Sequence, residues 1–260
     1  MKVTLELVNQ VINLAQQAGE KILSVYSRDF EVLEKSDQSP LTEADLLSHK
    51  ILVGGLELIT PTIPVLSEES SKIVIKDRLN WKTYWLIDPL DGTKEFVKKN
   101  GEFTVNIALV HKHQPVFGVV YAPVLNTTYW GSVELGAHKI IKKDSVAISV
   151  RERPKNISEW NIVGSRSHQS DDFKEFISQY PEAEIISMGS SLKLCLVAEG
   201  KADFYPRLGL TSEWDTAAAQ AIVEAAGGQV LKMPEMTSLR CNENESSLLN
   251  PYFLVCGDAL

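Results

Sequence analysis

The stretch WLIDPLDGTKEF, residues 85–96, joins an apolar run to two aspartates and a glycine. Asp, Pro and Gly are typical of tight turns, and Asp-Gly is a common hairpin signal. A turn alone does not account for Asp88, because it follows Trp-Leu-Ile directly and is expected near the core. A buried carboxylate is unfavourable unless it is paired or bound to metal, and residues 85–93 contain no Arg or Lys.

The composition is that of an ordinary globular protein, with 260 residues and 44% hydrophobic residues. The net charge of −8 argues against a general affinity for nucleic acid polymers or anionic membranes, which need a basic surface. The longest apolar run, residues 116–125, is too short to span a bilayer. Cys195, Cys241 and Cys256 show neither paired nor metal-ligand spacing. We therefore expect a cytoplasmic protein without disulfides, and loose association with the inner face of the membrane stays open.

The first half of the chain reads as helices followed by strands. Apolar residues recur at helical spacing in residues 1–26, and a second helix is expected to begin near Thr42. Short strands are expected at 64–69 and 83–88. Residues 103–133 are rich in Val, Ile, Thr and aromatic residues, with turn residues about every ten positions, which predicts antiparallel hairpins.

The second half alternates between strand and helix patterns, which indicates an α/β layer arrangement. Expected strands lie at 161–167, 184–190, 202–207 and 229–233, and expected helices at 171–180, 191–200 and 215–228. Polar residues 149–156 separate the two halves. The predicted domains are therefore 1–150, carrying most of the acids, and 151–260, carrying Asp215.

Acids recur at expected strand ends and helix starts, where ligand sites form in layered α/β folds. They are Asp45, Glu68, Glu69, Asp88, Asp91 and Asp215. Each has a plain alternative: Asp45 could complete a capping box with Thr42, and Asp215 could be an N-cap. Glu68 and Glu69 could belong to a solvated turn.

Magnesium resolves the problem of the buried acids, since it prefers carboxylate oxygens and partners phosphate. Two ions a few ångströms apart need acids from several segments. The DPLD spacing lets Asp88 and Asp91 face one site across a tight turn, while Gly92 and Thr93 present N–H groups for an anion. We predict that this turn directs two metal ligands and a phosphate-binding backbone to one point.

DPLDGT together with WDTAAAQAIVEAAGG resembles the two signature motifs of the inositol monophosphatase superfamily, magnesium-dependent and lithium-sensitive phosphatases. The strings VLSEE, NGEFTVNIALV, GVVYAPV, SRSH and GSSLKLCLVAEG resemble more specifically the CysQ-type 3′(2′),5′-bisphosphate nucleotidases. The similarity runs from about Ala15 to the C-terminus. It implies an αβαβα sandwich, in agreement with the expected elements.

The resemblance also implies roles for individual residues. Implied metal ligands are Glu68, Asp88, Asp91, Asp215 and the backbone carbonyl of Leu90, around two or three magnesium ions. Asp45 and Thr93 match the pair that activates the attacking water. Implied substrate-binding residues are His168, Ser190, Lys193 and Arg207 on the nucleotide side, with Glu68, Leu90, Asp91, Gly92, Thr93 and Asp215. For Lys193, the alternative is an ordinary solvated helix lysine.

The resemblance implies that the reaction is hydrolysis of the 3′-phosphate of adenosine 3′,5′-bisphosphate to AMP and phosphate, a step of sulfur assimilation. The related 3′-phosphoadenylyl sulfate is a second candidate substrate. Magnesium would lower the pKa of a bound water, Asp45 with Thr93 would take and orient its proton, and a second ion would stabilise the leaving ribose oxygen. The alternatives are an inositol-phosphate phosphatase, which would not need His168, Lys193 and Arg207, and a catalytically silent nucleotide- or metal-binding protein. The sequence does not indicate an oligomeric state.

Overall fold

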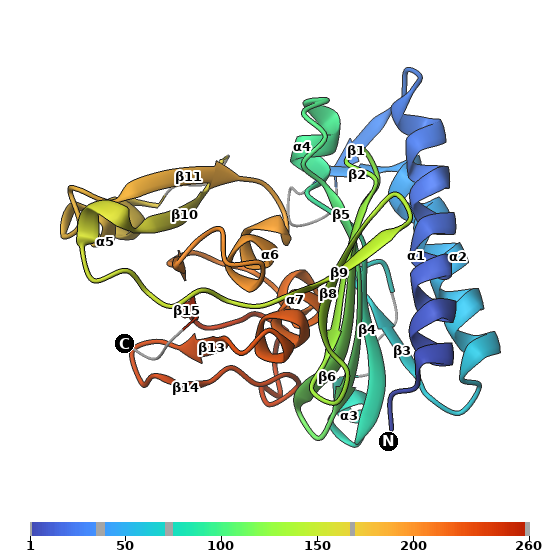
Figure 1. Cartoon of the computed structure of the whole chain (residues 1–260). Coiled ribbons are helices and arrows are strands. Elements are labelled where there is room, and N and C mark those ends of the chain that lie inside the picture. The colour runs from blue at the N-terminus through green and yellow to red at the C-terminus, as the bar shows by residue number, and fades with distance from the viewer. Residues whose placement is uncertain (1, 35–39, 71–74, 167–169, 258–260) are drawn as a thin grey trace.

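Helices and sheets alternate in layers in the computed structural model, which describes residues 2–34, 40–70, 75–166 and 170–257 (Figure 1). The helices are α1 Leu5–Tyr26, α2 Glu43–Ile59, α3 Ile75–Leu79, α4 Thr93–Val97, α5 Asp171–Ser178, α6 Leu192–Ala198 and α7 Glu213–Ala225. A short hairpin, β1 Val32–Glu34 with β2 Pro40–Thr42, precedes α2.

The larger sheet lies in the first half of the chain and runs in sequence order from β3 to β9. Its strands are β3 Val65–Ser67, β4 Thr83–Asp91, β5 Thr104–His111, β6 Gln114–Ala122, β7 Thr127–Ser132, β8 Gly136–Ile141 and β9 Asp144–Ile148. Only the β3–β4 pair is parallel among these described strands, and the rest are antiparallel neighbours. The predicted hairpins of residues 103–133 are confirmed.

The second sheet is mixed and has the order β11–β10–β12–β15–β13–β14 in the described chain. Its strands are β10 Asn161–Ser165, β11 Glu184–Met188, β12 Phe204–Arg207, β13 Gln229–Lys232, β14 Thr237–Ser238 and β15 Phe253–Cys256. The sequence patterns did not predict β15, a short, wholly buried strand without alternation. Yet β15 lies between β12 and β13 and joins the two halves of this sheet.

Three apolar clusters separate the layers and confirm the αβαβα arrangement. The first packs α1 and α2 against one face of the larger sheet. The second lies between the two sheets and includes most of α6 and α7. The third covers the outer face of the second sheet, where Ile177 of α5 and the adjacent Tyr180 pack. Figure 1 shows α6 and α7 between the sheets.

Helix α7 approaches the larger sheet unusually closely because the sheet carries glycines beneath it. Gly118 of β6 and Gly131 of β7 are direct partners across the strands. A Cβ at Gly118 would lie only 2.0 Å from the carbonyl oxygen of Ala218 in α7. The alanine-rich sequence of α7 completes this fit, and it holds the first turn of the helix, with Asp215, close to the end of β4.

The DPLD segment is not the tight turn that the sequence predicted. It continues β4 through a β-bulge, since Asp88 pairs with Asn106 while Asp91 pairs with Thr104. Pro89 has no N–H to donate to the ladder, and the Oδ1 atom of Asp88 accepts the N–H of Leu90 at 3.0 Å instead. The bulge changes the side-chain alternation of the strand at its end.

Candidate functional site

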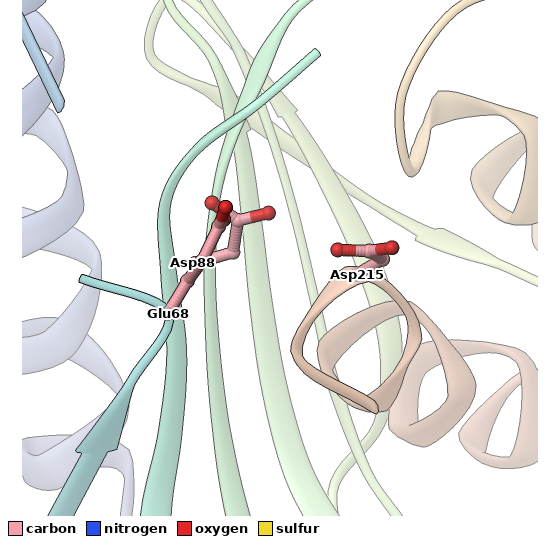
Figure 2. A group of neighbouring side chains, drawn as sticks. All are labelled: Glu68, Asp88 and Asp215. Atoms are coloured by element: carbon pink, nitrogen blue, oxygen red, sulfur yellow. The ribbon is translucent and has the colours of Figure 1, made fainter. Parts of the chain in front are cut away.

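Three acids from separate elements meet at the end of β4. An oxygen atom from each of Glu68, Asp88 and Asp215 lies within 4.8 Å of the others. Glu68 follows β3, Asp88 lies in β4 and Asp215 lies in the first turn of α7. Figure 2 shows Glu68 and Asp88 beside each other, with Asp215 facing them from the helix. Because Asp88 is buried, its predicted position near the core is confirmed.

Burial, together with the proximity of these acids, changes their ionisation. Burial raises the pKa of Asp88 well above its usual range, and the charges of Glu68, Asp91 and Asp215 raise it further. Burial, with the charge of Asp91 next, raises the pKa of Asp215 to about 8. None of the ion pairs among the described residues includes Asp88, Asp91 or Asp215, although the charge of Arg207 opposes the rise in the pKa of Asp215. An all-oxygen set of this kind fits a divalent cation such as Mg²⁺, which would supply the missing positive charge.

The three aspartates each use one oxygen atom to fix the side chain. Asp88 accepts from the N–H of Leu90, and the Oδ2 atom of Asp215 accepts the N–H of Ser212 at 2.9 Å. The Oδ2 atom of Asp91 accepts the N–H and the hydroxyl of Ser191 at 2.6 and 2.8 Å. The second carboxylate oxygen of Asp91 and of Asp215 is thereby oriented, whereas Asp88 also forms a side-chain hydrogen bond with Glu68.

Of the two helix-capping roles considered for the acids, the one for Asp45 is confirmed and the one for Asp215 is wrong. Asp45 does complete the capping box, because its Oδ2 atom accepts from the N–H and hydroxyl of Thr42 at 2.7 and 2.6 Å. Its Oδ1 atom still reaches the hydroxyl of Thr93 at 3.4 Å, so the cap and the predicted catalytic pairing coexist. Asp215 is not an N-cap: Ser212 caps α7, and Asp215 is the third residue of the helix.

The predicted phosphate-binding backbone lies directly beside the acids. Gly92 adopts a φ of 92°, in the left-handed region, and precedes the short helix α4. The carbonyl oxygen of Leu90 accepts the Thr93 hydroxyl at 3.3 Å, and the Leu90 side chain is buried. Glu69, which was not predicted as a ligand, donates its N–H to the hydroxyl of Ser67 at 3.3 Å.

Most of the predicted nucleotide-side residues share a cavity with Asp91 and Asp215. This cavity of about 570 Å³ is lined by residues from both halves of the chain. Its lining includes Asp91, Gly92, Thr93, Ser190, Lys193, Arg207 and Asp215. A neighbouring cavity of about 430 Å³ shares Tyr205 and Arg207 with it and reaches Phe173 of α5. His168 lies outside the described residues.

Lys193 is not the solvated helix lysine of the alternative reading. Its side chain is buried and donates to the carbonyl oxygen of Ser190 at 2.6 Å, with its Nζ atom 5.6 Å from the centre of the Tyr205 ring. Burial lowers the pKa of Lys193 to about 8, although Asp91 opposes the shift. A partly desolvated cation aimed at this cavity is suited to an anionic group of a ligand.

Sequence reasoning missed two residues that hold the site together, Ser191 and Asn106. The Asn106 side chain donates to the Ser191 hydroxyl at 2.8 Å and to Asp91 at 3.3 Å. Ser191 was visible only as the neighbour of Ser190, and Asn106 only as a polar residue within an apolar strand pattern. Such a buried amide in a β-strand is itself a signal of a polar network.

Comparisons with known proteins agree with this geometry. The family model described as the inositol monophosphatase family matches residues 4–252. The 3′(2′),5′-bisphosphate nucleotidase CysQ of Salmonella typhimurium is 46% identical over 257 residues, covering 96% of this chain and 99% of its own. The CysQ of Haemophilus influenzae is 39% identical, covering 97% of this chain and 93% of its own.

Solved structures show the same relationship. The crystal structure of CysQ from Bacteroides thetaiotaomicron superimposes with a TM-score of 0.85 at 41% identity, covering 96% of this chain and 97% of that one. An IMPase of Thermotoga maritima gives a TM-score of 0.79 at 25% identity, covering 97% and 92% of the two chains. Within the described residues, the helices are too short or too polar to cross a membrane. On its sequence, fold and acid cluster, the chain belongs to the inositol monophosphatase family.

Proposed function

We propose that this chain is a magnesium-dependent 3′(2′),5′-bisphosphate nucleotidase, which removes the 3′-phosphate of adenosine 3′,5′-bisphosphate and releases AMP. Phosphatases of the inositol monophosphatase family are metal-dependent. The curated relatives named CysQ are 39–47% identical to this chain. The observation that carries the proposal is a single cavity whose lining includes two of the acids, Asp91 and Asp215, together with Ser190, Lys193 and Arg207.

The proposed metal ligands are Glu68, Asp88, Asp91, Asp215 and the carbonyl oxygen of Leu90. Magnesium bound there would lower the pKa of a water and offset the charge of the phosphate. Their separate elements are fixed by packing, so the ligands need little rearrangement to receive an ion. The number of ions, two or three, is part of the proposal.

Asp45 and Thr93 are the proposed proton-handling pair. The Thr93 hydroxyl lies 3.4 Å from Asp45 and 3.3 Å from the carbonyl oxygen of Leu90, so its proton has two acceptors on the protein side. As the Thr93 oxygen accepts a proton from the attacking water, the Thr93 hydroxyl passes its own proton to the Asp45 carboxylate, which is neutralised by it. The N–H groups of Gly92 and Thr93 hold the scissile phosphate.

Lys193, Arg207 and Ser190 bind the phosphate that is not cleaved and the nucleoside. Both cations line the same cavity as Asp91 and Asp215, and Lys193 is oriented by its bond to the Ser190 carbonyl. His168 is proposed for the same role from the resemblance alone. The sulfonated nucleotide 3′-phosphoadenylyl sulfate, lithium inhibition and a cytoplasmic location also stay predictions.

Steady-state phosphate release tests the proposal. The purified chain with Mg²⁺ is assayed on adenosine 3′,5′-bisphosphate and on inositol 1-phosphate, with Asp88→Asn as the inactive control. We expect kcat/KM for the bisphosphate to be higher by about tenfold or more, because a charged contact to a second phosphate contributes on that order. Preference for inositol 1-phosphate would favour the inositol-phosphate phosphatase, and absence of turnover on both would favour a silent binding protein.

A further inference from the structure

Ser191 links the substrate side of the cavity to the acids. It follows Ser190 directly and is almost fully buried at 2% exposure. Its hydroxyl oxygen lies 2.8 Å from the Oδ2 atom of Asp91 and 2.5 Å from the backbone carbonyl oxygen of Asp215. A single side chain thus contacts two proposed metal ligands that are 124 positions apart in the sequence.

The Ser191 hydroxyl has two acceptors within hydrogen-bond distance, the Asp91 carboxylate and the Asp215 carbonyl, but only one proton. A serine hydroxyl donates one proton, so it can donate to Asp91 or to the Asp215 carbonyl at one time. The Asn106 amide donates to the same hydroxyl oxygen at 2.8 Å. Asp91 keeps the backbone N–H of Ser191 at 2.6 Å in either case. The hydroxyl can therefore hold the first turn of α7 without releasing Asp91.

Strand β5 fixes this arrangement from the other side. Asn106 and Thr104 are both fully buried, and the Thr104 hydroxyl donates to the Asn106 Oδ1 atom at 3.0 Å. Because the Asp91 carboxylate can only accept, its contact with the Asn106 amide at 3.3 Å assigns the amide orientation, with the NH₂ group toward Asp91 and Ser191. A buried network whose members are satisfied in this way is rigid, and replacing one member affects the others.

The loop before Ser191 is also tightly held. Ser190 has a positive φ of 47°, and a Cβ at Gly189 would lie 2.8 Å from the carbonyl oxygen of Glu102. The Gly189 N–H donates to the Glu102 carboxylate at 2.8 Å. The loop formed by Gly189 and Ser190 is therefore held in place, and a movement of this loop would also displace Ser191 and the Asp91 oxygen bonded to it.

We propose that Ser191 is a positioning residue for metal binding: its hydroxyl ties the first turn of α7, which carries Asp215, to the oxygen of Asp91 that the Ser191 N–H and Asn106 hold, so that both acids keep their place around the ion. This inference rests on the proposed function, because it takes Asp91 and Asp215 as metal ligands. Groups that orient metal ligands typically contribute about tenfold to a hundredfold in metal affinity or activity. Ser191 itself touches neither substrate nor ion in this role.

The test is the magnesium dependence of Tm in the metal-stripped protein, which reports the Kd without any turnover. In Ser191→Ala we expect the Kd for Mg²⁺ to rise by about tenfold or more. Asn106→Ala removes the donor to the same hydroxyl and should raise the Kd in the same direction. Ser191→Thr keeps the hydroxyl and should restore much of the affinity.

Ser132→Ala is the matched control. Ser132 is equally buried, and its hydroxyl accepts the N–H of Leu135 at 3.3 Å, but it lies in β7, three strands from β4. It should lower Tm in EDTA without changing the Kd for Mg²⁺. Wild-type magnesium affinity in folded Ser191→Ala or Asn106→Ala would overturn the inference. If wild type fails to hydrolyse the bisphosphate while Ser191→Ala still weakens magnesium binding, the proposed function fails and the inference stands.

Discussion

At the residue scale, the raised pKa values of Asp88 and Asp215 connect stability to pH. In an unfolded chain both carboxyls titrate near about pH 4. In the fold, the pKa of Asp215 is about 8 and that of Asp88 is well above its usual range. Between these values the folded, metal-free protein binds more protons than the unfolded chain, so its free energy of unfolding falls as pH rises from about 4 to 8.

We therefore expect Tm in EDTA to fall between pH 5 and pH 8, and the rise in Tm on adding Mg²⁺ to grow over the same window. The metal competes with protons for these carboxylates. It therefore stabilises the fold most at the higher pH values, where the carboxylates would otherwise carry their charges side by side without a cation. Thermal melts at several pH values, with and without Mg²⁺, measure both effects. Asp215→Asn should flatten the EDTA profile, and a wild-type Tm that rises with pH in EDTA would contradict the account.

Lys193 supports a second prediction at this scale, which separates substrate choice from chemistry. Loss of a charged contact to phosphate should lower kcat/KM for adenosine 3′,5′-bisphosphate by about tenfold to a hundredfold in Lys193→Ala. The Kd for Mg²⁺ should stay near wild type, as should slow hydrolysis of a simple monophosphate. Steady-state kinetics on both substrates measure this, with the exposed Lys143→Ala as control. Equal losses on both substrates would assign Lys193 to the reacting phosphate or to the fold.

At the element scale, the position of α7 depends on Gly118. A Cβ there would lie 2.0 Å from the Ala218 carbonyl, a backbone atom that cannot move aside as a side chain could. We expect Gly118→Ala to lower the free energy of unfolding by about 3 kcal/mol or more through overpacking. Because α7 carries Asp215, the same variant should weaken Mg²⁺ binding even though Gly118 lies outside the cavity lining.

Gly54→Ala is the matched control for this prediction. Gly54 lies within α2, and a Cβ there would meet nothing within 4 Å. Alanine is favoured over glycine inside a helix by about 1 kcal/mol, so this variant should be neutral or more stable. Chemical denaturation of the two variants compares them directly. Similar stability of Gly118→Ala and wild type would show that the helix and the sheet can separate without cost.

At the scale of the whole molecule, Glu102 joins the first half of the chain to the second. Its carboxylate accepts from Arg166 through two bonds of 2.7 Å and from the Gly189 N–H at 2.8 Å. Arg166 also donates to the carbonyl oxygen of Ser187. These contacts hold both the end of β10 and the loop that leads to Ser190, so they fix the substrate side relative to the metal side.

We expect Glu102→Ala to raise KM for the bisphosphate by about threefold to tenfold, because the freed loop must be ordered on binding. The kcat value should change less, since no proposed metal ligand or proton-handling group is removed. Asp171→Ala breaks an exposed ion pair with Lys174 on α5 and serves as the control. If the KM of Glu102→Ala equals that of wild type, packing alone is enough to keep the substrate side in place relative to the metal side.

The predicted division near residue 150 stays a prediction at this scale. The larger sheet ends with Ile148 and the second sheet begins with Asn161. Helices α6 and α7 nevertheless belong to the second half and pack in the apolar cluster between the two sheets, beside Leu66 and Leu86 of the first half. The two halves share one core there.

The sequence by itself determined the fold class, and it predicted the acids of the proposed site, because both depend on local patterns. Helical spacing, strand composition and the DPLDGT and WDTAAA motifs are readable from neighbouring residues, and they predicted the layers and the proposed acids. The capping role of Asp45 was readable too, since a capping box spans only three positions.

Only the tertiary structure decided how those patterns combine. The bulge at Pro89 depends on pairing with β5, β15 gains its place from neighbours on both sides, and Lys193 is buried by layers that meet only after folding. Ser191 and Asn106 belong to the site through contacts that span 85 positions. Such long-range contacts leave no periodic trace in the sequence, because a hydrogen bond between distant residues constrains only two positions.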